Sequence, residues 1–418
     1  MSQQVATSKG EGKKQEMPSA HFSGTHALIT KAMGAAEFGV MAEGESPAQH
    51  GVLVETGGNK ITLSTFDFET AVSVTVPAET PAAKKRSLLN FVEMKKTLAA
   101  LVAGEPRAAA ARTRLSLAGD LLSTEHLTVP VEALDLHEFA HPPEAVPAAV
   151  KVDAQLFLAQ ANRVLPAAGR DDTLPTLTGI GLTLDGQTLT MAATDCYRFA
   201  VADLPAPATL QSPTGPLTAI IPARTIARIA KQLKAHDGPV GIGISETDAR
   251  VTFSTGTMTI TSRPLDGHFP KHSSLFPTER DMVVAIDRDA AVRATKKCQA
   301  LAKAKGQTLT PVSLEWDADA ILTAAPLLAD PADQARTKGM TIRSAIEHGV
   351  DTLRGNTLCL NPAFLLDALG TFTSDTITLH LRGVKGDQIA KPVLLTEGTE
   401  TSGDGYRHLL MPVRTTDK

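Results

Sequence analysis

A zinc-binding spacing is the first feature of the sequence that could support chemistry. His137, Glu138 and His141 form an H-E-x-x-H pattern, which in metalloproteases places two zinc ligands on one helical turn with the glutamate as base. Pro142 and Pro143 follow at once, and the residue before a proline is biased away from helical angles. We therefore expect a linker here, and a zinc hydrolase that uses His137 and His141 remains a remote alternative.

No other part of the sequence carries a complete catalytic motif. It contains neither a G-x-x-x-x-G-K-[ST] phosphate loop nor the G-x-S-x-G turn of a nucleophilic serine. Cys196, Cys298 and Cys359 are too few and too scattered for a disulfide framework or a zinc site, which is typical of a reducing cytoplasm. Cys196, beside Tyr197 at a strand end, is more typical of a small buried apolar residue than of a nucleophile. The sequence therefore carries no complete catalytic motif, and the family resemblance described below implies a protein that is not an enzyme and needs no cofactor or metal.

Positive charge is concentrated in two helix-like stretches of a chain whose formal net charge is −4. Residues 222–236 hold four basic residues and no acidic one, and residues 287–305 hold six basic residues against two acidic ones. In the first stretch Ile226, Ile229 and Leu233 recur at helical spacing, so the basic side chains occupy another face of the helix. The charge is therefore sorted onto particular surfaces.

A basic helix face can be an ordinary solvated surface or a nucleic-acid interface. Further basic residues fall in or just after corresponding helices elsewhere in the chain, and this recurrence favours the second interpretation. Such a surface would contact phosphates without reading bases, which gives salt-sensitive binding to duplex DNA of any sequence. The residues that we predict to face DNA are Lys31, Lys95, Lys96, Arg163, Arg170, Arg224, Arg228, Lys231, Arg293, Lys296 and Lys297.

Three segments of the sequence resemble one another at intervals of about one small domain. Residues 51–63 align without a gap with residues 179–191, and residues 180–193 align in turn with residues 312–325. Each segment is typical of a strand, a turn and a strand. Because solenoid repeats are only a few tens of residues long, this spacing indicates a whole domain in three copies.

Each copy is expected to combine two helices with a run of antiparallel strands. This order is typical of an α+β fold in which helices cover one face of a sheet. The periodic stretches predict helices near residues 26–38, 88–104, 154–165, 223–236, 288–305 and 363–372. We expect a disordered tail over residues 1–21, followed by domains over residues 22–147, 148–283 and 284–418.

The order and spacing of several motifs resemble those of the bacterial DNA polymerase III beta subunit, the sliding clamp. The resemblance implies three similar DNA-clamp domains in each subunit and two subunits that close head to tail into a ring around duplex DNA. The helices would line the hole and the sheets would form the outer rim. The resemblance spans about residues 22–414 and rests on LTMAATDCYRFAVADL (189–204), LDGHFPKHSSLFP (265–277), DRDAAVRATKKCQALA (287–302), NPAFLLDALGTF (361–372) and HLLMPVR (408–414).

The resemblance also implies a groove between the second and third domains that binds a short peptide. Its partners would be the DNA polymerase III catalytic subunit, the clamp loader and other proteins with a clamp-binding motif. An apolar slot with a few polar groups suits a peptide's hydrophobic anchors, although Leu177, Phe199 and Leu410 could equally be ordinary interdomain core. The aligned residues are Leu177, Thr194, Arg198, Phe199, Pro270, Leu275, Asn361, Phe364, Leu410, Met411, Pro412 and Val413.

The chain departs from the family pattern at some of these positions. Cys196 and Tyr197 stand where Gly-His is common, Ser274 where an arginine is frequent, and Leu309 where an aromatic residue can occur. These departures leave open an accessory clamp paralogue that serves repair or a mobile element. A β-rich scaffold without DNA contact is a further alternative.

In the family, an edge strand of the first domain joins an edge of the third domain of the partner subunit. An unpaired edge strand seeks a partner, and ring closure removes that liability. By alignment the interface would involve Leu127 and Val129 on one side and Leu301 on the other, so the resemblance implies a homodimer. No segment approaches the roughly 18 apolar residues of a membrane span, and we expect a cytoplasmic protein with no membrane partner.

Overall fold

The computed structural model describes residues 19–41, 46–207, 215–271, 275–276, 280–308, 310–403 and 405–414. The chain divides into two compact units, which are described separately below. Unit 1 comprises residues 1–145 with residues 256–261, and unit 2 comprises residues 146–255 with residues 262–418.

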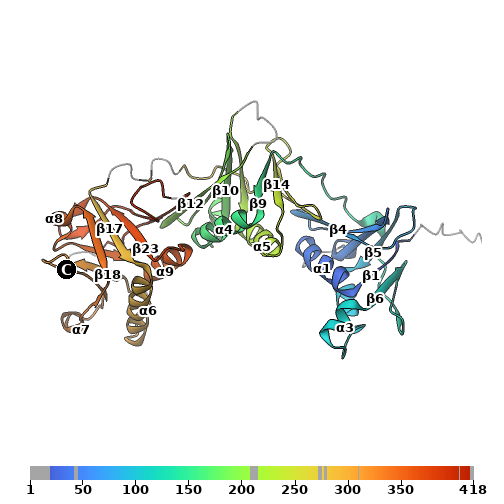
Figure 1. The fold of residues 1–418 in the computed structure, drawn as a ribbon, viewed down its shortest axis with the longest axis horizontal. Coiled ribbons are helices and arrows are strands. Elements are labelled where there is room, and N and C mark those ends of the chain that lie inside the picture. The colour runs from blue at the N-terminus through green and yellow to red at the C-terminus, as the bar shows by residue number, and fades with distance from the viewer. Residues whose placement is uncertain are drawn as a thin grey trace, which may run out of the picture. The chain divides into compact units, whose positions relative to one another are not determined.

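In the described residues of unit 1, antiparallel strands combine with the helices α1, α2 and α3 (Figure 1). The sheets have the strand orders β1-β6-β7-β8 and β5-β2-β3-β4-β16. Helix α1 packs against β3 and β4. In chain order the elements are β1 (His21–Thr25), α1 (His26–Ala36), β2 (Gly51–Gly57), β3 (Lys60–Phe66), β4 (Thr70–Pro77), β5 (Lys85–Asn90), α2 (Phe91–Ala100), α3 (Arg107–Arg112), β6 (Arg114–Ala118), β7 (Leu121–Ser123), β8 (Thr128–Pro130) and, from the second half of the chain, β16 (Met258–Ser262).

Local sequence explains the boundaries of these elements. Gly58 and Asn59 connect β2 and β3, and both have positive φ (63° and 58°), which the tightest hairpin turns require and these two residue types tolerate. The side chain of Asn90 accepts a hydrogen bond from the Glu93 backbone N–H and so caps α2. Strand β1 begins at His21, the last residue of the expected tail.

The described residues of unit 2 include a nine-stranded sheet, a six-stranded sheet, and three further strands in which β14 pairs with β15 and with β9. The nine-stranded sheet has the order β13-β10-β11-β12-β27-β26-β23-β17-β21, and the six-stranded sheet has the order β20-β19-β18-β22-β25-β24. The first half of the unit contains β9 (Val150–Asp153), α4 (Ala154–Val164), β10 (Gly179–Asp185), β11 (Thr188–Thr194), β12 (Arg198–Pro205), β13 (Leu217–Pro222), α5 (Ala223–Leu233), β14 (Pro239–Ser245) and β15 (Arg250–Ser254).

The second half of unit 2 joins the first half in one sheet, because β27 pairs with β12 from Arg198↔Leu410 to Ala202↔Tyr406. Its elements are β17 (Met282–Asp287), α6 (Arg288–Ala304), β18 (Val312–Trp316), β19 (Leu322–Pro326), α7 (Pro331–Arg336), β20 (Met340–Thr341), β21 (Ser344–His348), α8 (Val350–Leu353), β22 (Thr357–Leu360), α9 (Pro362–Thr371), β23 (Thr376–Leu381), β24 (Val384–Lys385), β25 (Gln388–Ile389), β26 (Val393–Thr396) and β27 (Tyr406–Leu410).

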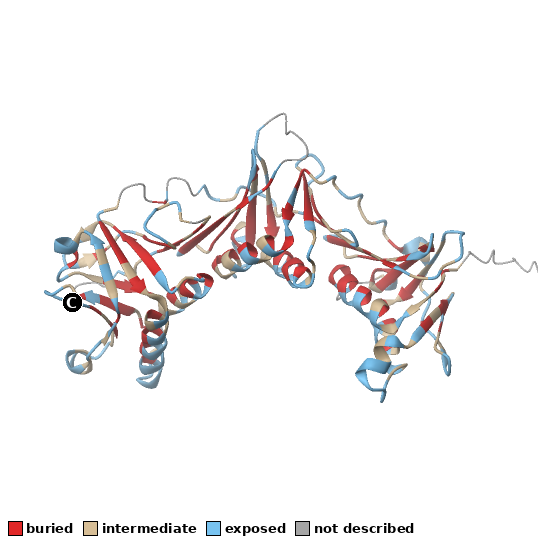
Figure 2. Ribbon diagram, viewed as in Figure 1, coloured by how far each residue is buried: buried red, intermediate tan, exposed pale blue. Residues whose placement is uncertain are grey.

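Helices are present at all six predicted places. The side chains of Asp153, Asp287 and Asn361 accept hydrogen bonds from the first turns of α4, α6 and α9. Each helix has one buried and one exposed side (Figure 2). The short helices α3, α7 and α8 were not predicted, and α3 lies between α2 and β6.

The H-E-x-x-H segment does not form the helix that a zinc site of this type needs. His137 and Glu138 belong to a three-residue 3₁₀ turn, Leu136–Glu138, whose N-cap is Asp135. Phe139 is buried and packs with Leu53 and Leu88, which anchors the segment to the sheet. Within the described residues no group of three or more His, Cys, Asp or Glu side chains could hold a metal ion, and no helix could cross a membrane.

Candidate partner site and nucleic-acid interface

Helix α5 separates its charge from its core side as its sequence predicts. Ile226, Ile229 and Leu233 are buried. Arg224, Arg228 and Lys231 are exposed on the opposite side. The helix therefore offers a row of positive charge that no acidic residue of its own interrupts.

Helix α6 repeats this arrangement over a longer surface. Arg293, Lys296 and Lys297 are exposed, while the face that contains Cys298 is buried. Burial raises the pKa of the Cys298 thiol to about 11, so this cysteine is a packing residue. The basic residues of α6 thus lie on its solvent side.

Four predicted DNA-facing residues of the other helices are also exposed. Lys31 lies in α1, Lys95 and Lys96 lie in α2, and Arg170 follows α4. Lys95 forms an ion pair with Glu37 at 2.6 Å, with both side chains about half exposed. A surface pair of this kind is weak and does not remove the local positive potential.

Arg163 does not fit the predicted role of a DNA-facing residue. Its guanidinium is mostly buried, lies 3.3 Å from the Glu397 carboxylate, and sits over the ring of Tyr406 at 5.1 Å from the centroid. Sequence alone placed it on the basic face of a helix, but that face of α4 packs against residues from the C-terminal part of the chain. Its charge is therefore neutralised inside unit 2.

Arg163 belongs to a buried polar network that connects the two halves of unit 2. The Tyr406 hydroxyl lies 3.0 Å from the Arg163 carbonyl, 2.9 Å from Thr371 Oγ1 and 2.8 Å from His408 Nδ1. Burial would raise the pKa of Glu397, but hydrogen bonds from the backbone N–H groups of residues 373 and 374 and the charge of Arg163 lower it overall. Glu397 is therefore a carboxylate at neutral pH, as an ion pair with Arg163 requires.

The predicted peptide groove is centred on a tight turn between β11 and β12. The Asp195 carboxylate accepts hydrogen bonds from the backbone N–H groups of Tyr197 (3.0 Å) and Arg198 (3.1 Å), and Thr194 Oγ1 donates to the Arg198 carbonyl at 2.7 Å. Cys196 has φ of 76°, which a non-glycine residue rarely adopts. It is exposed, unlike the buried cysteine that we expected. The turn is therefore fixed by hydrogen bonds and projects Tyr197 outward.

Arg198 supports this turn from within the protein. Its guanidinium pairs with Asp195 at 2.8 Å and with Asp367 of α9 at 2.7 Å. It also lies 4.5 Å from the ring centroid of Phe364. Because the Arg198 side chain is only 5% exposed, it positions the turn and α9 relative to each other, and is not itself a contact surface.

An exposed apolar surface surrounds the turn. The Tyr197 ring is 62% exposed and stacks against Phe364, with the centroids 6.1 Å apart. The Met411 backbone N–H donates to the Tyr197 carbonyl at 2.8 Å, which places the exposed Met411 side chain beside the turn. Leu275 is also exposed. Aromatic and thioether side chains presented in this way are typical of surfaces that bind peptides.

The predicted groove residues divide into this surface and a core beneath it. Leu177, Phe199 and Leu410 are buried, so the core interpretation fits all three. Phe199 packs edge-to-face against Phe269 and Phe276. Thr194 is buried, Pro270 is exposed, and Asn361, Pro412 and Val413 are half-buried. Ser274 and Leu309 lie outside the described residues.

Four contributors to the site were not among the predicted residues: Tyr197, Phe269, Phe276 and Asp367. Phe269 and Phe276 fall in the 265–277 segment, where the apolar residues of an otherwise polar stretch were the available signal. The Asp367 contact with Arg198 spans 169 positions, and no local pattern indicates it.

The predicted subunit-contact residues lie at a sheet edge or on an exposed helix surface. Leu127 is 52% exposed, next to β8, which contains Val129 and is the outermost strand of its sheet. Leu301 is 56% exposed on α6. On the six-stranded sheet of unit 2, the outermost strand on the β19 side is β20.

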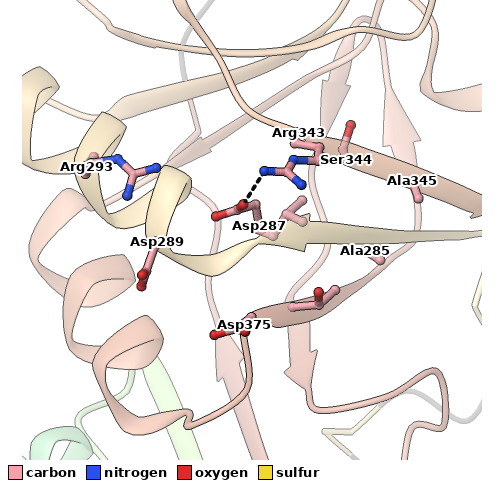
Figure 3. Close-up of a pocket in the computed structure, with 10 residues that line it drawn as sticks. Ala285, Asp287, Asp289, Arg293, Arg343, Ser344, Ala345 and Asp375 are labelled. Atoms are coloured by element: carbon pink, nitrogen blue, oxygen red, sulfur yellow. Dashed lines mark ion pairs between the residues drawn. The ribbon is translucent and has the colours of Figure 1, made fainter.

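A hollow at the start of α6 holds charged residues that serve the helix itself. In Figure 3, Asp287 and Arg343 point toward one another, and their closest charged atoms are 3.3 Å apart. The other Asp287 oxygen accepts the Ala290 backbone N–H at 2.8 Å. Both oxygens of Asp287 are therefore committed to capping and pairing.

Comparisons with known proteins agree with this geometry. Residues 151–271 match the family model described as the central domain of the DNA polymerase III beta subunit. The chain is 29% identical to the beta sliding clamp of Streptomyces coelicolor, covering 93% of this chain and 97% of that protein. It is 26% identical, with the same coverage, to the beta sliding clamp homolog GriR of Streptomyces muensis.

Solved structures show the same fold. The DnaN sliding clamp of Pseudomonas aeruginosa, bound to griselimycin, superposes with a TM-score of 0.77 at 20% identity, covering 95% of this chain and all of that one. The Bacillus subtilis clamp gives a TM-score of 0.76 at 16% identity with the same coverage. The α+β architecture is therefore that of sliding clamps. Over most of its length the chain is similar to beta sliding clamps, and its central part matches the DNA polymerase III beta subunit family.

Proposed function

We propose that this protein is a DNA sliding clamp of the cytoplasm, which encircles duplex DNA as a head-to-tail homodimer and tethers DNA polymerase and other partners. The observation that carries the proposal is that α5 and α6 expose basic side chains to solvent in a chain of net negative charge with the sliding-clamp fold. A closed ring cannot leave DNA sideways, so weak phosphate contacts are enough and leave the ring mobile along the duplex.

Three DNA-clamp domains, over residues 22–147, 148–283 and 284–418, are supported by the order of elements. The sequence strand, helix, several strands, helix occurs as β1-α1-β2-β3-β4-β5-α2, again as β9-α4-β10-β11-β12-β13-α5, and again from β17 and α6 to β22 and α9. In each case antiparallel strands follow the second helix.

The same repetition supports the homodimer. The last strand of the second copy, β16, lies beside β4 of the first copy, and the last strand of the third copy, β27, lies beside β12 of the second. The last strand of the first copy is β8, and the strand of the third copy that corresponds to β4 and β12 is β20. Both are outermost strands, so β8 of one subunit would pair with β20 of the other, near Leu127, Val129 and Leu301.

Charge reversal tests the DNA contact. The triple variant Arg224→Glu, Arg228→Glu, Lys231→Glu should weaken binding to duplex DNA and make it less dependent on salt, because each lost phosphate contact lowers the salt slope by about 1. Fluorescence anisotropy with a labelled duplex at several salt concentrations measures both quantities. Lys151→Glu, an exposed change on β9, is the matched control. Unchanged binding in the triple variant would support a scaffold without DNA contact.

The surface around Tyr197, Phe364 and Met411 is the proposed docking site for short peptides of the DNA polymerase III catalytic subunit, the clamp loader and other clamp-binding proteins. Support comes from its exposed apolar side chains on a turn that Arg198 and Asp195 hold in place.

An accessory role in repair or on a mobile element is the second candidate, favoured by Cys196-Tyr197 and by the similarity to the GriR homolog. Pull-down with immobilised replicase peptides and repair peptides separates the two roles.

A further inference from the structure

Two sheets of the molecule end in edge strands of the same build, β5 in unit 1 and β13 in unit 2. Each edge strand leads directly into a helix, α2 or α5. A residue from further along the chain forms a hydrogen bond with the outer edge of each strand. On β5 the Leu134 N–H donates to the Leu88 carbonyl at 2.9 Å, and on β13 the Leu265 N–H donates to the Ile220 carbonyl at 2.7 Å. The outward backbone groups in the second half of each strand therefore have hydrogen-bond partners. The two strands differ in their first halves.

On β13 a carboxylate covers the first half of the edge. Glu246 accepts a hydrogen bond from the Thr218 backbone N–H at 3.1 Å and lies 3.2 Å from the Thr218 hydroxyl. Thr218 precedes Ile220 by two residues, so its N–H points to the same outer side of the strand. The unpaired edge donor is therefore satisfied by an acidic side chain.

On β5 the corresponding position is Arg86, two residues before Leu88. The Leu88 carbonyl and the Asn90 N–H both bond outward, to residues 134 and 132. Every second residue of an antiparallel strand points its backbone groups to the same side, so the N–H and carbonyl of Arg86 also point outward. Neither group has a partner in the part of the chain that the structure describes. The nearby Glu55 carboxylate, which could accept from the N–H, pairs with the Arg86 guanidinium at 2.7 Å.

The surroundings of the two edges differ in charge as well. A hollow of about 640 Å³ beside Arg86 has four basic residues and one acidic residue in its lining: Lys60, Lys84, Lys85, Arg86 and Glu55. Gly57 leaves room on the strand for the Lys84 stem, since a Cβ there would lie 3.2 Å from Lys84 Cγ. The hollow beside β13 contains Glu246 and Asp266 against one lysine.

We infer that the β5 edge and its basic hollow bind an extended acidic segment of a partner protein. The segment adds as a strand beside Lys85–Ser87 and places a carboxylate at the Arg86 N–H, where β13 uses Glu246. Main-chain hydrogen bonds supply affinity in strand addition, and the lysines select for acidic side chains. This site is separate from the surface around Tyr197 and from the basic helix faces.

Two other occupants fit less well. Residues 1–18 of the chain carry three lysines and two glutamates, so their charge does not complement the hollow. Single-stranded DNA is usually held by aromatic side chains that stack on its bases, and none lines this hollow.

A peptide pair tests the inference directly. A fluorescein-labelled octapeptide of alternating glutamate and valine should bind the full-length protein about ten-fold more tightly than its glutamine counterpart in anisotropy titrations at low salt. Its affinity should fall as salt is added. The double variant Lys60→Glu, Lys84→Glu should weaken it about ten-fold.

Two variants of one residue isolate the backbone contact. Arg86→Gln keeps the outward N–H, whereas Arg86→Pro removes it at an edge position where proline is tolerated. The proline variant should bind the glutamate peptide several-fold more weakly than the glutamine variant, with both thermal unfolding curves recorded to establish that the variants fold. Equal binding by the two variants would overturn the strand-addition mode.

Control variants separate this site from the proposed clamp activity. Lys31→Glu with Lys96→Glu, and removal of residues 1–18, should leave peptide affinity unchanged, while Lys60→Glu with Lys84→Glu should leave retention on circular DNA unchanged. The inference is overturned if the glutamine peptide binds as well as the glutamate peptide. It is also overturned if oligo(dT) binds more tightly than the peptide and loses its binding in the Lys60/Lys84 variant.

Discussion

The turn before β12 in unit 2 and the turn before β4 in unit 1 use the same backbone device. In unit 2 the Asp195 carboxylate accepts the N–H groups of the second and third residues after it, and in unit 1 Asp67 does the same for Glu69 and Thr70. The residue after each aspartate has positive φ: 76° at Cys196 and 69° at Phe68. The turn itself is therefore shared.

The side chains behind the two turns differ. Arg198 follows the turn in unit 2 and is buried between two carboxylates, whereas Thr70 occupies the corresponding place in unit 1. The partners of Arg198 include Asp367 and Phe364 from the last part of the chain. The same turn can therefore occur with or without a binding surface, and the residues that pack against it determine which.

Ionisable groups inside the protein show the same contrast. Among the described residues, every buried arginine or histidine belongs to unit 2: Arg198, His380 and His408. Unit 1 has a core of apolar side chains, threonine, serine and one glutamine. Unit 2 should therefore be the more sensitive to pH and to the loss of single polar groups.

The largest expected effect is acid destabilisation of unit 2. Burial, with a smaller contribution from Arg280 or Arg198, lowers the pKa of His380 to about 4 and of His408 to about 3. Both are neutral when folded and bind protons near pH 6.5 when unfolded, so their stabilising effect is complete above that pH and is lost as the pH falls toward their folded pKa values. We expect the free energy of unfolding to drop by about 2 kcal/mol for each histidine between pH 7 and pH 5.

Tryptophan fluorescence in urea measures this effect selectively, because the only tryptophan of the chain, Trp316, is buried in β18 of unit 2. The double variant His380→Gln, His408→Gln should show a flatter pH dependence. A wild-type midpoint that does not change between pH 7 and pH 5 would contradict the assignment of neutral buried histidines.

The second largest loss of stability is expected when the buried Arg198 guanidinium is removed. Arg198→Ala leaves Asp195 without its partner in a mostly buried place, and we expect unit 2 to lose about 3 kcal/mol of stability. Thr70→Ala at the corresponding place in unit 1 should cost about 1 kcal/mol or less. Urea titrations followed by tryptophan fluorescence for the first variant and by circular dichroism for both give the comparison, and equal losses would show that the two turns have the same energetic role.

A smaller loss is expected from the network that joins the halves of unit 2. Tyr406→Phe removes a hydroxyl that contacts Thr371, His408 and the Arg163 carbonyl, and leaves these groups buried. We expect a cost of about 1 to 2 kcal/mol, measured by the same titration. Thr62→Val, which removes a hydroxyl from a partly buried pair in unit 1, is the matched control and should cost less.

The smallest effect on stability should accompany a clear effect on binding. Tyr197→Ala removes an exposed ring, so stability should change by about 0.5 kcal/mol or less, while affinity for a polymerase-derived peptide should fall about ten-fold. Phe68→Ala also removes an exposed ring, from the turn of unit 1, and should leave that affinity intact. If both variants bind the peptide equally well, the docking surface lies elsewhere.

Sequence patterns predicted the local parts of this structure well. The six helices, the strand-turn-strand segments at 51–63, 179–191 and 312–325, and the basic side of α5 depend on residues within a few positions of each other, and all are present. Helix α3 was missed because its alanine-rich stretch lies between strands and has no apolar periodicity.

The parts that could not be predicted depend on distant contacts. The burial of Arg163 follows from Glu397 and Tyr406, more than two hundred positions away, and a helical pattern cannot show which side chains will cover it. The division of the predicted groove into an exposed surface and a buried core has the same origin, because it depends on where residues 269 and 276 pack.

One measurement tests the proposed clamp activity most directly. The protein is loaded onto nicked circular DNA with a clamp loader and ATP, washed in high salt, and then challenged with a restriction enzyme that cuts the circle once. The account predicts that the protein stays on the intact circle and leaves promptly once free ends exist. Persistent retention on the cut DNA would contradict a topological hold.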